Sequence, residues 1–333
     1  MEERITLDYG SGGRKTSALI EELLVPAFAN EALSKLGDGA VLALDGPLAF
    51  STDSFVVSPW FFPGGDIGKL AVCGTVNDLA MCGAEARYLS LSLILEEGFP
   101  MEDLKRIIHS VSETAKACGV AVVNGDTKVV EKGKGDGIYL NTAGIGTVRL
   151  PGLSPGAIRP GDRVLVSGTV GDHGCAVMAA RDGLLETDGL VSDCRPLQEL
   201  ARSLWPFGNA IRVLRDPTRG GVATTLNEFT EGRPFSIELE ESAIPVRPQV
   251  RGACEILGLD PLYCANEGKL LAVVAPEREE EVLAALRHTD GGGEAARIGT
   301  VTETYPGRVV LATAYGGKRI LTKLTGAQLP RIC

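Results

Sequence analysis

The chain has 333 residues, of which 44% are apolar and 23% charged, and its formal net charge is −10. It contains no run of roughly 20 apolar residues that could span a membrane, and its acidic balance disfavours a nucleic-acid or membrane-surface partner. The polar start lacks an apolar signal core. We therefore expect a globular cytoplasmic protein with one large or two medium domains.

The first half of the chain predicts strands and helices in turn. Short apolar or alternating runs predict three strands, at residues 41–51, 88–95 and 138–148. Residues 66–82 predict a helix with Asp66 as its N-cap. Residues 102–118 predict a second helix, because apolar side chains recur at helical spacing and Gly119 stands where a C-terminal cap belongs.

The Pro- and Gly-rich residues 149–162 predict a domain boundary. Beyond it strands and helices alternate again, with strands at 163–168, 270–276 and 308–313 and helices from about 174, from about 218 and near 278–287. We therefore expect a mixed α/β fold in two domains, 1–150 and 151–325, with a tail at 326–333.

Five aspartates lie beside small or polar residues: Asp38, Asp53, Asp78, Asp126 and Asp216. Carboxylates near strand ends and loops are natural ligands for Mg²⁺. Asp78 is the most informative, because it lies in an apolar helical run where an unpaired charge is costly. A buried salt bridge is the alternative explanation for Asp78, and the other aspartates are also typical of caps and turns.

Two glycine-rich segments are candidates for phosphate binding. The first comprises Gly10, Ser11, Gly12, Gly13, Arg14 and Lys15. Its glycines allow close backbone approach, but the spacing is not that of a P-loop, and a mobile arm is an equal alternative. The second, Asp216-Pro217-Thr218-Arg219-Gly220-Gly221, opens an expected helix whose free amides attract phosphate, or is a plain helix start.

The eight cysteines include no Cys-x-x-Cys pair, and their spacing matches no zinc pattern, so most are expected to be buried free thiols. Cys333 differs because it ends the chain. Pro330 keeps its segment extended, and Gly326 offers a hinge. The residues after Gly326 could reach roughly 23–25 Å. The sequence therefore predicts a thiol on a flexible tether.

Longer motifs extend over the whole chain: YGSGG at 9–13, DGA at 38–40, TDSFVVSPWFFPGGDIGKLAVCGTVNDLAMCGA at 52–84, GDTKVV at 125–130, DPTRGGVATTLNE at 216–228, ANEG at 265–268 and PRIC at 330–333. They resemble the HypE family of NiFe-hydrogenase maturation factors, in the superfamily of aminoimidazole ribonucleotide synthetase and selenophosphate synthetase. Asn124 and Cys82 depart from this pattern without touching an expected ligand.

The resemblance implies a two-domain PurM-like ATP-binding fold whose N-terminal half forms a homodimer, with nucleotide between the halves. It also implies that the carbamoyltransferase HypF places a carboxamide on the terminal sulfur. ATP then drives dehydration of the carboxamide to a thiocyanate. The cyano group passes to iron held by a HypC–HypD complex.

The resemblance also assigns residues to roles. Mg²⁺ is expected at Asp38, Asp78 and Asp216, and ATP is expected at Asp53, Asn77, Asp126, Thr127 and the two glycine-rich segments. Lys128 is expected to stabilise the transferred phosphate, and Glu267 to handle a proton beside Cys333. The glycine-rich segments contribute Gly10, Ser11, Gly12, Gly13, Lys15, Thr218, Arg219, Gly220 and Gly221.

Three alternatives stay open at the level of the sequence. In selenophosphate synthetases the N-terminal loop carries cysteine or selenocysteine, whereas this loop has Ser11. A phosphotransferase of the purine or thiamine pathway is the second alternative, but such an enzyme would have no use for the terminal PRIC sequence. A non-catalytic maturation scaffold would show no ATP turnover.

Overall fold

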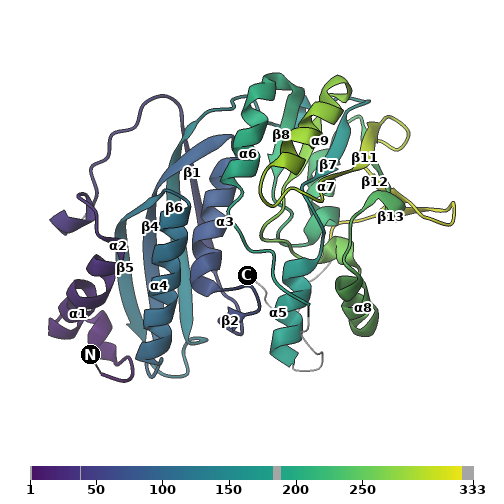
Figure 1. Cartoon of the computed structure of the whole chain (residues 1–333). Coiled ribbons are helices and arrows are strands. Elements are labelled where there is room, and N and C mark those ends of the chain that lie inside the picture. The colour runs from purple at the N-terminus through teal and green to yellow at the C-terminus, as the bar shows by residue number, and fades with distance from the viewer. Residues whose placement is uncertain (1, 38, 183–188, 325–333) are drawn as a thin grey trace.

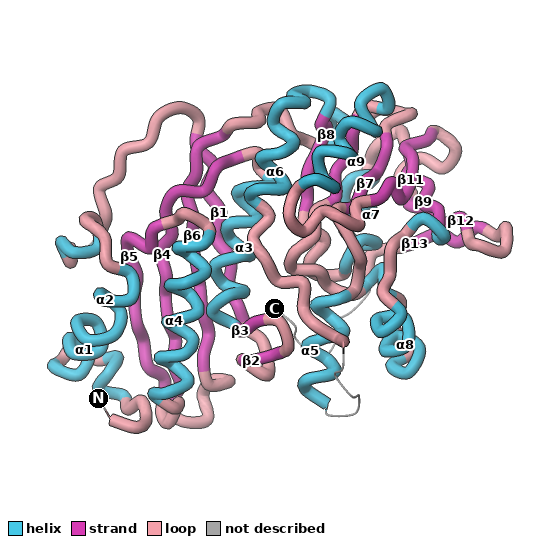
Figure 2. The backbone as a smooth tube through the Cα atoms, in the orientation of Figure 1, coloured by secondary structure: helices cyan, strands magenta, loops and turns pink. Residues whose placement is uncertain are grey.

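The computed structural model describes residues 2–37, 39–182 and 189–324 (Figure 1). Two of the expected site residues, Asp38 and Cys333, lie outside the described residues, as does the expected tail at 326–333. The described chain forms two large sheets side by side, each with helices packed against it, and a separate two-stranded hairpin (Figure 2). None of its helices is long and apolar enough to cross a membrane.

The first sheet has the strand order β1-β6-β4-β5, and all of its pairs are antiparallel except β4 with β5. Its strands are β1 (Leu48–Phe55), β4 (Ala84–Glu96), β5 (Ala121–Val130) and β6 (Ile138–Val148). Helices α3 (Ile67–Met81) and α4 (Met101–Ala117) cover one face of this sheet (Figure 1). The small hairpin β2 (Phe61–Phe62) and β3 (Gly65–Asp66) leads into α3.

The caps expected for these two helices are confirmed. The Asp66 carboxylate accepts hydrogen bonds from the amides of Gly68 and Lys69, at 2.8 and 3.0 Å. Gly119 follows α4 with a φ of +65°, a left-handed conformation that favours glycine. Short helices precede the sheet along its β5 edge: η1 (Leu7–Gly10), α1 (Arg14–Leu19), the π-helix η2 (Ile20–Leu24), α2 (Val25–Phe28) and η3 (Leu33–Lys35).

The second sheet has the order β13-β12-β9-β11-β7-β10-β8, and only β12 with β9 is parallel. Its strands are β7 (Arg163–Val166), β8 (Ile211–Arg215), β9 (Ser236–Glu240), β10 (Leu271–Val274), β11 (Ala296–Thr302), β12 (Val309–Ala312) and β13 (Lys318–Leu321). Its helices are α5 (Asp172–Asp182), α6 (Gln198–Leu204), α7 (Gly221–Thr230), α8 (Pro248–Leu257) and α9 (Glu279–His288). Short 3₁₀ turns connect them: η4 (Pro155–Ala157), η5 (Trp205–Ala210), η6 (Glu241–Ala243), η7 (Pro261–Tyr263) and η8 (Pro276–Arg278).

Both faces of the second sheet are buried at its centre, which explains the continuous apolar runs of β7 and β10. Val164 and Val166 of β7 pack with α7 on one face, whereas Leu165 packs with α6 and α9 on the other. Because successive side chains alternate between faces, a strand covered on both sides needs apolar residues at every position.

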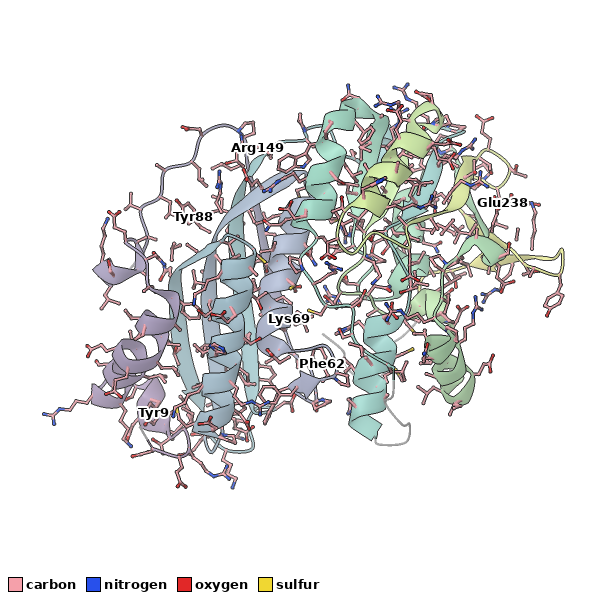
Figure 3. All side chains as sticks on the ribbon, viewed as in Figure 1. Tyr9, Phe62, Lys69, Tyr88, Arg149 and Glu238 are labelled. Atoms are coloured by element: carbon pink, nitrogen blue, oxygen red, sulfur yellow. The ribbon has the colours of Figure 1, made fainter. Side chains whose placement is uncertain are left out.

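The two halves share packing. Ala80 and Met81, at the end of α3, join the apolar cluster of α6 and α9, and Ala265 joins the core of the first half. Phe62 of β2, which is labelled in Figure 3, meets the His173 ring of α5 edge-on, with centroids 5.5 Å apart. These contacts fix the space between the halves.

The mixed α/β fold is confirmed, with three local corrections. The strand expected at 41–51 begins only at Leu48, because Gly46 has a φ of +83° and Pro47 lacks an amide proton. The helix expected from about 218 begins at Gly221. Lys128 lies within β5, a strand that is not among those expected from the sequence. The expected domain boundary between residues 150 and 151 stays a prediction.

Candidate active site

A cleft of about 330 Å³ lies between the two halves. Its walls come from β1 and α3 on one side and from the β8–α7 connection on the other. The cleft is lined by Phe50, Ser51, Thr52, Asp53, Phe55, Gly74, Asp78, Met81, Cys82, Leu214, Arg215, Asp216, Thr218, Arg219 and Glu267. Four acidic residues from distant parts of the sequence therefore meet in one place.

Asp78 projects from α3 toward β1, where its carboxylate accepts a 2.7 Å hydrogen bond from the Ser51 hydroxyl. Burial raises the pKa of Asp78, and the negative charge of Asp53 adds to the effect. The salt bridge considered from the sequence is not found, because no ion pair within 4.0 Å involves Asp78 among the described residues. Arg215 and Arg219 lower the pKa of Asp78 only at longer range.

Asp216 follows β8 and is only 5% exposed. Burial is the main cause that raises its pKa to about 7, and Asp78 and Asp53 contribute further. Its main-chain carbonyl accepts a hydrogen bond from the Thr218 amide at 3.0 Å, so the turn that carries it is ordered. A buried carboxyl next to other carboxyls is suited to hold either a proton or a cation.

The two glycines after Arg219 are needed for close packing at the start of α7. Gly220 and Gly221 have φ values of +73° and +61°. A Cβ on Gly221 would lie 2.5 Å from the Leu262 carbonyl oxygen. No side chain caps the first turn of α7, which begins beside the cleft-lining Thr218 and Arg219, but the Gly221 amide donates to the Thr218 carbonyl at 2.9 Å.

Glu267 is 3% exposed, and burial raises its pKa well above the ordinary value. Its backbone is held on both sides. Its amide donates to the Asp193 carboxylate at 3.1 Å, and its carbonyl accepts a hydrogen bond from the Asn77 side chain at 3.3 Å. The main chain therefore holds the Glu267 carboxyl at the cleft wall.

Residues that support this wall were missed in the sequence. Asp193 also accepts a hydrogen bond from the Gly268 amide at 3.2 Å, and it pairs with Lys269 at 3.1 Å. Lys269 lies 3.8 Å from Asp172, and all three side chains are less than 10% exposed. Lys269 follows the ANEG motif directly and could have been suspected, but no local pattern marks Asp193 or Asp172.

Asn77, expected to bind nucleotide, is fully buried and is not among the residues that line the cleft. Its side-chain amide donates to the carbonyls of Arg195 and Glu267, and its oxygen accepts a hydrogen bond from the Leu197 amide at 2.7 Å. Asn77 therefore joins α3 to the second half of the chain, and its expected nucleotide contact stays a prediction.

The N-terminal glycine-rich segment lies away from the cleft, against the outer strand β5. A Cβ on Gly10 would clash with the Val129 backbone amide. Lys15 forms ion pairs with Glu2 at 2.9 Å and with Asp8 at 3.3 Å. The Ser11 hydroxyl donates to the Asp8 carbonyl. Within one chain this segment, including Gly12 and Gly13, does not join the cleft residues.

A second cavity of about 320 Å³ lies between the N-terminal helices and β5, and its lining includes Asp126 and Thr127. Lys128 donates to both oxygens of Asp126 at 2.7 Å, which lowers the pKa of Asp126. The Lys128 side chain is 61% exposed. The expected site residues thus form two groups, one in the cleft and one at the β5 edge.

Comparison with known proteins places the chain in a family. The models of the AIR synthase related protein match at residues 36–148 for its N-terminal domain and 159–312 for its C-terminal domain. Carbamoyl dehydratase HypE of Cupriavidus necator is 50% identical over 333 residues, covering 99% of this chain and 95% of that protein. The HypE of Escherichia coli (strain K12) is 49% identical and covers 99% of both chains. The chain belongs to the HypE family.

Solved structures of HypE proteins share this fold. A HypE crystallised with ATP has a TM-score of 0.95 and 49% identity, covering 98% of this chain and 99% of that one. A HypE–HypF complex has a TM-score of 0.80 and 48% identity, covering 92% and 100%. A thiamine-monophosphate kinase from Stenotrophomonas maltophilia, at 20% identity and a TM-score of 0.68, shares the fold alone. The family and the enzyme class predicted from the motifs are confirmed.

Proposed function

We propose that the chain is an ATP-dependent carbamoyl dehydratase that converts a carboxamide on Cys333 to a thiocyanate. The observation that carries the proposal is the cleft between the halves, where four buried or half-buried acids face Thr218 and Arg219. The full-length identity to carbamoyl dehydratases supports the same reaction.

The reaction balances in two steps. The oxygen of the thiol-bound carboxamide attacks the γ-phosphorus of ATP, which releases ADP and leaves a phosphorylated imidate after loss of one amide proton. Loss of the second proton then expels inorganic phosphate and leaves S–C≡N. Phosphorylation is needed because an amide oxygen leaves poorly, and this kind of transfer depends on charge neutralisation and positioning.

The cleft suits Mg²⁺, because hard carboxylate oxygens are its preferred ligands and the burial of Asp216 beside Asp78 and Asp53 creates a need for a cation. We assign Asp78 and Asp216 to the metal, together with Asp38 from outside the described residues. The ion would neutralise charge on the ATP phosphates. Asp53 supports the nucleotide side of the same cleft.

Glu267 is assigned the transfer of an amide proton. A carboxylate whose pKa is raised by burial is a stronger base than an ordinary glutamate, and it lies in the wall of the cleft. Thr218, Arg219 and the uncapped first turn of α7 supply hydrogen-bond donors and positive charge for the phosphates. Asp193 positions Glu267 through its main chain.

A homodimer is proposed from the open face of the first sheet. Ser51 of β1 contacts Asp78 of α3, so Leu48 and Phe50 point to the other side of the sheet, where they are 49% and 69% exposed; Ile94 of β4 is 42% exposed. Large apolar side chains exposed along one sheet face are typical of a protein interface. We infer that a second copy of the chain covers this face.

The dimer also offers a way to unite the two groups of site residues. Lys128 lies opposite Ile94 and so faces the open side, and β1 and β5 are the outer strands of the sheet. A two-fold axis along the strands at the sheet centre stacks β5 of one protomer over β1 of the other. Lys128 of one protomer then approaches the cleft of its partner.

Mixed dimers test this arrangement. Lys128→Ala and Asp216→Asn are each expected to lose dehydration while folding and dimerising. If the site is shared between protomers, one of the two sites in each mixed dimer is intact, and random mixing restores roughly one quarter of wild-type activity. No recovery in verified mixed dimers would place Lys128 outside the partner's site.

The expected partners complete the reaction. We propose that HypF supplies the carboxamide, and the relative crystallised as a HypE–HypF complex supports this. A HypC–HypD complex is proposed as the acceptor of the cyano group. The cytoplasm is proposed as the location, because ATP is available there.

Mass spectrometry of the C-terminal peptide tests the function. After incubation with HypF and carbamoyl phosphate the peptide should gain about 43 Da, and it should lose about 18 Da when ATP is added, as expected for a thiolate nucleophile. Cys333→Ala should abolish both changes. Cys82→Ser is the matched control, because Cys82 is the exposed cysteine of the described residues and lines the cleft. Modification of Cys82 instead of Cys333 would refute the proposal.

A further inference from the structure

Three cysteines that are distant in sequence meet in the second half of the chain. Cys175 lies on α5, Cys254 on α8, and Cys264 directly after η7. The Cys254 sulfur is 3.6 Å from that of Cys175 and 3.9 Å from that of Cys264. All three sulfurs lie within 4.8 Å of one another, which no other group of His, Cys, Asp or Glu ligand atoms achieves in the described residues.

These separations fit a common metal ligand sphere. For a metal–sulfur bond of about 2.3 Å, they correspond to S–metal–S angles of about 103° and about 116°, on either side of the tetrahedral value. A disulfide would need sulfurs about 2.05 Å apart. Two thiols in simple contact can also lie 3.6 Å apart, so the convergence of three sulfurs is the feature that indicates a metal.

The surroundings close the cluster off from solvent. Cys175 is fully buried, and Cys254 and Cys264 are each 2% exposed. The cluster packs with Val250, Ala253 and other apolar side chains of α5 and α8. Soft, polarisable thiolates in a dry pocket select d¹⁰ ions over Mg²⁺, which prefers oxygen and keeps its water.

We propose that Cys175, Cys254 and Cys264 form a binding site for one thiophilic d¹⁰ metal ion, of the class of Zn²⁺ and Cu⁺, separate from the ATP cleft. Binding of a divalent ion to three thiols yields a metal trithiolate with one negative charge and releases three protons. The bound ion would hold α5, α8 and the segment after η7 together.

The position of Cys264 connects this cluster to the cleft. Ala265, Asn266 and Glu267 follow it directly. The Asn266 side chain accepts a hydrogen bond from the Gly171 amide at 2.8 Å and donates to the Pro217 carbonyl at 3.0 Å. A metal on Cys264 would therefore stiffen the segment that carries Glu267, from behind the cleft wall.

Cadmium titration of the reduced, metal-free full-length protein tests the site, because thiolate-to-Cd²⁺ charge transfer absorbs in the ultraviolet. We expect the band to saturate at one Cd²⁺ per chain. Cys175→Ser, Cys254→Ser and Cys264→Ser should each lose it. Cys118→Ser is the matched control, because Cys118 is also buried but lies outside the cluster. The Cys82→Ser/Cys333→Ser double variant should keep the band.

Competition between bound Cd²⁺ and added Zn²⁺ or Cu⁺ then distinguishes these ions. The ion that displaces Cd²⁺ at the lower free concentration is the preferred occupant. X-ray absorption of the zinc-loaded wild-type protein gives a second measurement that needs no variant. It should show at least three sulfur ligands at about 2.3 Å. Absence of a one-equivalent cadmium band in the wild type, its persistence in Cys254→Ser, or fewer than three sulfur ligands would overturn the proposal.

Discussion

Replacing Asp216 by asparagine should stabilise the metal-free protein at alkaline pH. Asp216 is 5% exposed, and its pKa rises from 3.8 to about 7 because burial and nearby carboxylates oppose its charge. At about 1.36 kcal/mol per pKa unit, ionising this group in the folded state costs at most about 4 kcal/mol. Asparagine keeps the shape of the side chain and removes that cost.

The direction of the pH dependence follows from the raised pKa. The folded protein binds the Asp216 proton more tightly than the unfolded chain does. The contribution of this proton to the free energy of unfolding is therefore fully present below pH 3.8 and is lost as pH rises through about 7. The wild type should therefore weaken from pH 4 to pH 8 relative to Asp216→Asn. Mg²⁺ at pH 8 should recover stability in the wild type and recover less in the variant.

Urea unfolding at pH 5 and pH 8, in chelator and in Mg²⁺, measures these differences. Asp162 provides a matched control, because it is 1% exposed but pairs with Arg212 at 3.2 Å. Asp162→Asn leaves that guanidinium without its partner and should destabilise the protein at pH 8. If Asp216→Asn were less stable than the wild type in chelator at pH 8, or if the difference did not change with pH, the reasoning about the cleft charges would be wrong.

Three further replacements test the parts of the site separately. Glu267→Gln should leave carbamoylation of the tail intact and block its ATP-dependent loss of water, as read by peptide mass, because the amide side chain cannot accept the proton. Asp193→Asn should cost at most about 3–5 kcal/mol in urea unfolding, because buried Lys269 loses its 3.1 Å ion pair and keeps only the 3.8 Å pair with Asp172; an unchanged midpoint would contradict this. Asn77→Ala should cost about 1–3 kcal/mol through unpaired main-chain groups between the halves, and unchanged stability would show that water replaces the side chain.

Local chemistry predicted much of the fold. The Asp66 cap and the apolar spacing of residues 102–118 were sufficient for α3 and α4, because a helix depends on contacts a few residues apart. The strand expected at 138–148 coincides with β6. Strands β5, β8, β9, β11 and β13 were not predicted. In β5, Asn124-Gly125-Asp126 interrupts the apolar pattern, yet pairing with β4 keeps it extended.

The sequence pointed to those cleft residues whose type is unusual for their position. Asp78 stood out in an apolar helix, and the structure places it in the cleft with Asp53 and Asp216. Asp193 carries no such signal, because its role depends on amides 74 and 75 residues away. The cysteine cluster was hidden for the same reason, since zinc patterns in sequence depend on short spacings, whereas Cys175 and Cys254 are 79 residues apart.

Helix α3 explains why two neighbouring polar residues have different roles. Asn77 and Asp78 are adjacent, so their side chains leave the helix about 100° apart. Asp78 turns toward Ser51 in the cleft, and Asn77 turns toward the carbonyls of Arg195 and Glu267. One turn of helix therefore supplies a charged group to the cleft and also holds the backbone of Glu267 on the opposite wall. The distance between the expected metal ligand and the expected base is thus set by a single rigid element.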